Sequence, residues 1–74
     1  MNYPPSETSP EITAQRAADA LALALEEAGF DVGRTFPSLL GVVALNGTPM
    51  VELGGITAAV ATRLAEVLTH RPDA

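Results

Sequence analysis

An Asn-Gly pair at positions 46 and 47 separates two short apolar runs, and this feature constrains the fold more than any other. Asn-Gly flanked by apolar residues is the strongest short-range signal for a β-hairpin, because both residues accept the left-handed backbone of a tight turn. The sequence therefore predicts two antiparallel strands, about Leu39 to Leu45 and about Pro49 to Leu53, joined by a two-residue turn at Asn46 and Gly47.

Both faces of this predicted hairpin are apolar. A two-residue turn pairs Leu45 with Thr48, and side chains alternate between the faces from there. An antiparallel hairpin with one side in water should show polar residues on that side. We therefore expect each face to be covered, either by one helix each or by both helices on one face and a second copy of the chain on the other. The first face carries Leu40, Val42, Ala44, Val51 and Leu53, and the second carries Leu39, Val43, Leu45 and Met50.

Pro49 distinguishes the two edges of the hairpin. Its backbone nitrogen falls next to the pair that flanks the turn, at a position whose N–H would point away from the partner strand. Because proline has no N–H, the outer edge of the second strand is blunted against strand addition. The first strand is the edge left free to pair, either with residues 31–36 or with another chain in a four-stranded sheet.

A helix is predicted before the hairpin. Ser9 is the expected N-cap, Pro10 occupies the first helical position, and Gly29 supplies the left-handed residue that ends the helix. Ile12 and Leu23 break the polar side of this amphipathic helix, so they are candidates for a second contact stripe. The residues predicted to face the core are Ala14, Ala17, Ala18, Leu21, Ala22, Leu25 and Ala28.

A second helix is predicted over Ile56 to His70, with Thr57 as its N-cap and with Arg71 and Pro72 ending it. Residues 31–36 read either as a short first strand or as an extended connection, and Pro37 requires residue 36 to be non-helical. The sequence thus predicts an α+β class domain of two layers in the order helix, β-hairpin, helix. Residues 1–8 are expected to be a flexible tail, residues 9–71 the domain, and residues 72–74 a C-terminal tail.

The size of the chain makes association attractive. A chain of 74 residues forms one small domain, and such domains bury too little surface to be robust without disulfides, metals or oligomerisation. The chain has no cysteine, which removes disulfides and thiolate metal sites. Self-association is the supplement that remains.

The residues that carry chemistry are few, and we predict neither an enzyme nor a cofactor nor a metal site. His70 is the single histidine and is expected to form a surface pair with Glu66, one helical turn earlier. Glu26, Glu27 and Asp31 do not have the spacing of a calcium loop. The glycines at 54 and 55 match no phosphate-binding motif, and we interpret them as a tight turn.

The sequence accordingly predicts a non-enzymatic protein-protein interaction module, homodimeric through the hairpin, with a regulatory or accessory role. The alternative is a small nucleic-acid-associated transcriptional regulator whose dimer gathers Arg34 and Arg63, although a net charge of −5 disfavours nucleic acid. No apolar run is long enough to span a bilayer and the first ten residues do not resemble a secretory signal, so a cytoplasmic protein is expected. The predicted interaction surface comprises Leu39, Val43, Leu45, Met50, Ile12 and Leu23.

Overall fold

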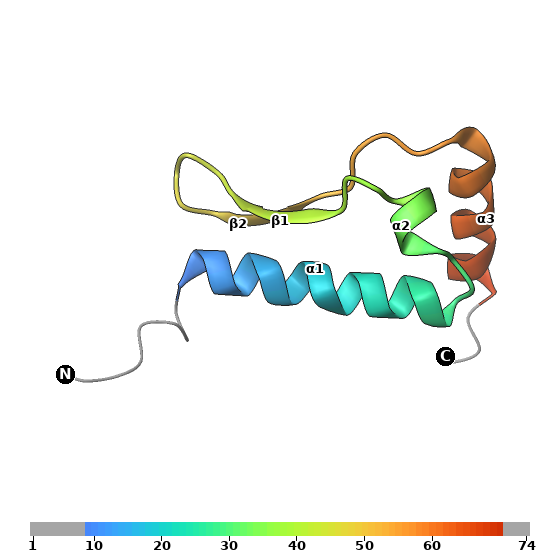
Figure 1. Cartoon of the computed structure of the whole chain (residues 1–74), viewed down its shortest axis with the longest axis horizontal. Helices are drawn as coiled ribbons and strands as arrows, with labels where there is room; N and C mark the ends of the chain where they lie inside the picture. The colour runs from blue at the N-terminus through green and yellow to red at the C-terminus, as the bar shows by residue number, and fades with distance from the viewer. Residues whose placement is uncertain (1–8, 71–74) are drawn as a thin grey trace.

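The structure is a computed structural model that describes residues 9–70. It confirms the predicted order of helix, antiparallel hairpin and helix in a small α+β domain. The hairpin lies alongside the N-terminal part of α1, and α3 crosses the C-terminal end of α1 (Figure 1). The predicted tails, together with Arg71 and Pro72, lie outside the described residues. The elements are α1 (Pro10–Glu27), α2 (Val32–Thr35), β1 (Leu40–Val43), β2 (Pro49–Glu52) and α3 (Ala58–Thr69).

Helix α1 begins and ends where its capping residues predict. Ser9 is the N-cap, and its side chain accepts a hydrogen bond from the backbone N–H of the third residue after it. At the other end Gly29 has a φ of 100°, and its N–H donates to the carbonyl of Glu26 at 3.0 Å. Phe30 N–H donates to the Leu25 carbonyl at 3.0 Å, which completes a Schellman motif and turns the Phe30 ring back onto the helix.

The core is small and lies where α1, α2 and α3 meet. Phe30 and Phe36 are in edge-to-face contact, with ring centroids 5.6 Å apart and an interplanar angle of 85°. Ala17 was predicted to face the core but is exposed. The five buried hydrophobic residues of the described chain are Ala14, Ala18, Leu25, Phe30 and Phe36. Partly buried residues packed around the two rings and Leu25 are Leu21, Ala28, Val32, Leu39, Ile56, Val60, Leu64 and Val67.

The segment from Asp31 to Phe36 forms neither the short strand nor the extended connection considered above. It contains the one-turn helix α2, in which the Asp31 carbonyl accepts the N–H groups of Arg34 at 2.9 Å and Thr35 at 2.8 Å. The Thr35 hydroxyl donates to the same carbonyl at 2.8 Å. Pro37 ends the turn, and Phe36 is non-helical with φ −131° and ψ 60°, as predicted. Local hydrogen bonding to one carbonyl therefore outweighs the strand propensity of this segment.

Helix α3 begins at Ala58, two residues later than predicted, because Thr57 is its N-cap and accepts the Val60 N–H at 3.1 Å. Arg63 of α3 contacts the residues that follow the C-terminal end of α1. Its Nη2 donates to the Gly29 carbonyl at 3.0 Å, and its guanidinium lies 4.6 Å from the centroid of the Phe30 ring.

The predicted register of the hairpin is wrong by one residue. Val42 pairs with Met50, and Ala44 N–H donates to the Thr48 carbonyl at 2.9 Å. The loop therefore has three residues, from Leu45 to Gly47, in place of two. Gly47 takes a φ of 90° and donates its N–H to the Ala44 carbonyl at 2.8 Å. This is a β-turn followed by a left-handed residue, the next commonest hairpin connection after the two-residue turn.

The shifted register decides which face of the hairpin meets α1. Gly41 lies so close to the helix that a Cβ placed on it would be 2.6 Å from the backbone oxygen of Ala14. Residues on the same face as Gly41 are its partner Val51 and the neighbouring pair Val43 and Pro49. This face contains no polar side chain, and α1 covers it.

Candidate interaction surface

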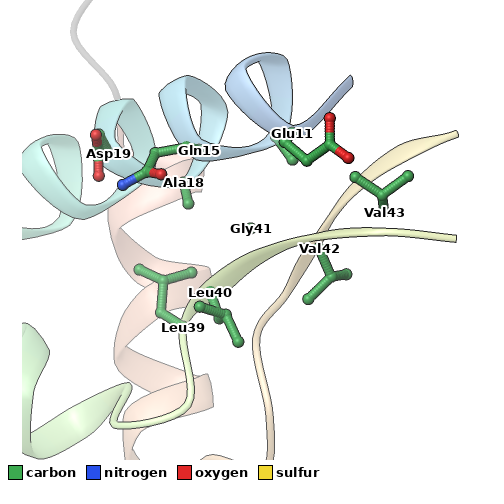
Figure 2. Close-up of a pocket in the computed structure, with 10 residues that line it drawn as sticks. Glu11, Gln15, Ala18, Asp19, Leu39, Leu40, Gly41, Val42 and Val43 are labelled. Carbon is green, nitrogen blue, oxygen red and sulfur yellow. The ribbon is translucent and has the colours of Figure 1, made fainter. Parts of the chain in front are cut away.

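The face of the hairpin that points away from α1 is uncovered. It carries Leu40, Val42 and Met50, with Glu52 opposite Leu40. Within the described residues, Leu40 is 56% exposed and Met50 49% exposed. We call Leu40, Val42 and Met50 the outer face. Figure 2 shows the division, since Val42 points away from α1 and Val43 points toward it.

The predicted surface residues are not brought together. Leu39 packs against the core and Val43 is half-buried on the α1 side. Met50 is on the outer face, and Leu45 is fully exposed in the hairpin loop. The structure places Leu40 and Val42 beside Met50, whereas the sequence predicts them on the opposite face, because the predicted loop is one residue shorter. Along α1, Ile12 is half-buried and Leu23 is 58% exposed.

A hollow of about 490 Å³ lies beside β1, and α1 forms its other wall (Figure 2). Its strand side is formed by the consecutive residues Leu39 to Val43, and β2 contributes nothing to it. Its helix side combines the small side chains of Ala14 and Ala18 with a polar ridge. The ridge consists of Glu11, Gln15 and Asp19 on successive turns of α1, and all three are exposed.

A second hollow, of about 200 Å³, lies between α1 and α3 and is lined by apolar side chains. Two of its lining residues, Leu53 and Leu68, are 40% and 58% exposed. The hollow ends against the buried ring of Phe36, so it opens from the surface toward the core. The lining residues are Leu21, Ala24, Leu25, Ala28, Phe36, Leu53, Leu64, Val67 and Leu68.

Two titratable side chains, Glu11 and His70, make local hydrogen-bond contacts. The Ser9 hydroxyl donates to the Glu11 carboxylate at 2.7 Å, and this hydrogen bond lowers the pKa of Glu11 below its usual value. His70 Nδ1 lies 2.8 Å from the backbone carbonyl of Glu66, so the imidazole meets a carbonyl at the helix end in place of the predicted side-chain pair. Within residues 9–70, no three His, Asp or Glu side chains are grouped so that they could hold a metal ion.

Comparison of the chain with protein-family models, with curated proteins and with solved structures gave no match. Within the described residues, none of the helices has both the length and the apolar character required to cross a membrane.

Proposed function

We propose that the protein is a non-enzymatic interaction module that self-associates through the outer face of its hairpin. The observation that carries this proposal is the uncovered outer face, where Leu40 and Met50 are each about half exposed. Only five hydrophobic residues are buried within residues 9–70, so the fold gains stability from any apolar surface that a second copy removes from water. The regulatory or accessory role and the cytoplasmic location remain predictions from the sequence.

The size of the outer face sets the expected strength of the dimer. Fully burying a Leu or Met side chain contributes about 1.5 to 3 kcal/mol, so residues already half-buried contribute about half of that each. Summed over two protomers, the three side chains supply several kcal/mol, against an association cost of at least about 4 kcal/mol. The surplus is at most about 5 kcal/mol, so the dimer is expected to be weak, with a dissociation constant of about 0.2 mM or higher, and to form at protein concentrations of about 0.1 to 1 mM.

Sedimentation velocity over that concentration range tests the proposal. We expect the wild-type sedimentation coefficient to rise with concentration, and Met50→Glu to remove the rise, because two facing carboxylates would lose their hydration. Leu45→Glu is the matched control, since Leu45 is fully exposed in the loop and lies outside the outer face. A wild-type protein that stays monomeric over the whole range, or a dimer unaffected by Met50→Glu, would refute the proposal.

The nucleic-acid alternative gains no support from the structure. Of the two arginines that it required, Arg63 donates to the Gly29 carbonyl and stacks on Phe30. A guanidinium engaged in this way holds α3 in place. Arg34 alone is a sparse electrostatic footprint for a phosphate backbone.

A further inference from the structure

The β1 strand has a free hydrogen-bonding edge. The Ala44 and Thr48 pair is hydrogen-bonded, and in an antiparallel ladder such pairs alternate with pairs whose backbone groups point outward. The outward groups of β1 are therefore the N–H and C=O of Gly41 and Val43. The sheet has two strands, so within residues 9–70 no strand pairs with this edge.

The hollow of about 490 Å³ runs along this free edge. Both the residues that face α1, such as Val43, and the residues that face away, such as Val42, border the hollow, whereas β2 does not. That combination places the hollow beside β1 rather than between the sheet and the helix. Extended peptides add to a sheet at an edge strand whose backbone donors and acceptors are free. Here α1 forms the opposite wall of such an edge.

The helix wall defines the charge of a matching peptide. Glu11 and Asp19 stand eight residues apart on α1, which corresponds to about 12 Å at 1.5 Å per residue. In an extended chain, residues four positions apart are separated by about 13.5 Å and project to the same face. Cationic side chains at positions i and i+4 of an added strand would thus reach the two carboxylates, with residue i+2 beside Gln15.

We propose that the β1 edge binds an extended segment of a partner protein, added antiparallel to β1 and carrying Arg or Lys four residues apart on the face toward α1. This deepens the proposed function as an interaction module, but it uses a different surface from the dimer face. A second copy of the chain is a poor occupant of this edge. Pairing β1 with its own copy about a two-fold axis would place the two polar ridges, with their Glu11 and Asp19 carboxylates, side by side. Each copy also carries a net charge of −5, so the two copies would repel each other.

Fluorescence anisotropy with two labelled, blocked peptides tests the proposal. The probe is Thr-Arg-Val-Thr-Val-Arg-Thr, and its counterpart has Glu in place of both arginines. We expect the arginine peptide to bind and the glutamate peptide not to bind. The double variant Glu11→Gln with Asp19→Asn should weaken binding about fivefold, the scale of two exposed ion pairs. The variant Glu26→Gln with Glu27→Gln makes the same change in net charge away from the hollow and should bind as wild type does.

Proline substitutions test the edge itself. Val43→Pro removes an outward N–H of β1, whereas Val51→Pro removes an outward N–H of β2, and neither N–H is used in the hairpin ladder. We expect Val43→Pro to abolish peptide binding and Val51→Pro to retain it. Equal binding by the two variants would overturn the proposal, as would equal binding of the arginine and glutamate peptides by the wild-type protein.

Methylated peptides give a test that leaves the protein unchanged. In an antiparallel addition, the peptide residues that hydrogen-bond to β1 are those that face α1, namely the two arginines and the threonine midway between them, and any two neighbours in this set that pair with Gly41 and Val43 include an arginine. N-methylation of the two arginine amides should abolish binding, and N-methylation of the two valine amides should not. Any other pattern would overturn the antiparallel arrangement. If the protein is monomeric but binds the arginine peptide, only the proposed self-association is refuted. If it dimerises but does not bind the peptide, only the proposed peptide site at the β1 edge is refuted.

Discussion

Replacing Gly41 by alanine should destabilise the fold, because the added methyl group has no space. Its Cβ would lie 2.6 Å from the Ala14 oxygen and 2.7 Å from the Ala14 carbonyl carbon, whereas ordinary contacts begin at 3.4 Å. The strand and the helix must separate by at least 3.4 − 2.6 = 0.8 Å at this point. Both atoms belong to the backbone of α1, so no side chain can rotate away.

The cost follows from the packing that the shift disturbs. Overpacking of this kind costs about 1 to 3 kcal/mol, and alanine recovers roughly 0.5 kcal/mol by restricting the unfolded chain. The net loss is about 1.5 kcal/mol, which lowers the melting temperature of a domain of this size by about 6 to 12 °C. A domain with 62 described residues has a total stability of about 3 to 9 kcal/mol, so the loss is a large share of it.

Urea denaturation followed by circular dichroism at 222 nm measures this loss at a concentration where the protein is monomeric. Gly55→Ala is the matched control, because a Cβ there meets nothing within 4 Å and the backbone of Gly55 does not have a positive φ. The control should be unchanged or more stable by up to about 1 kcal/mol. If Gly41→Ala unfolds at the same midpoint as Gly55→Ala, the close approach of β1 to α1 is refuted.

Two further predictions concern polar side chains. Arg63→Met should lower the free energy of unfolding by about 1 kcal/mol, because it removes the contact with Phe30 and the hydrogen bond to a backbone carbonyl, and Arg34→Met should change it little. Equal urea midpoints for these two variants would contradict the anchoring role. Ser9→Ala should raise the pKa of Glu11 toward its usual value of 4.5 in an NMR titration, because the hydroxyl donor is lost. Because the pKa of Glu11 is lowered in the folded state, the ionised carboxylate stabilises the fold above pH 4.5. This contribution to the free energy of unfolding is lost as the pH falls through the folded-state pKa, and the loss should be smaller in Ser9→Ala.

Helices α1 and α3 could be predicted from the sequence because capping residues mark their ends. Ser9, Pro10 and Gly29 set the bounds of α1 through local hydrogen bonds and a left-handed glycine. The one-turn helix α2 could not be predicted in the same way, since its four residues are too few to show a helical period. Its hydrogen bonds are local: the Asp31 carbonyl accepts three, and the Val32 carbonyl accepts the N–H of Phe36 at 2.9 Å.

The hairpin shows where local signals stop being sufficient. Asn46-Gly47 fixed the place of the turn, but both the two-residue and the three-residue loop are compatible with it. The choice between them depends on a contact with α1, a segment distant in sequence. In the observed register Gly41 faces the helix, which can then approach the strand, and Thr48 and Glu52 face away from it. The residues of the predicted surface on the hairpin are therefore divided between its two faces and its loop.

Thr48 explains why the prediction of a blunted β2 edge does not depend on the register of the hairpin. It belongs to a hydrogen-bonded pair in both registers, with Leu45 in the predicted one and with Ala44 in the observed one. The next residue, Pro49, therefore points its nitrogen outward in either case, and the edge of β2 is blunted in both. The change of register affects only β1. Residues of β1 that would hydrogen-bond to β2 in the predicted register point their N–H and C=O groups outward in the observed one, and the reverse. Gly41 and Val43 therefore point their backbone N–H and C=O groups outward, toward the hollow and the polar ridge of α1. The peptide site proposed above depends on this register.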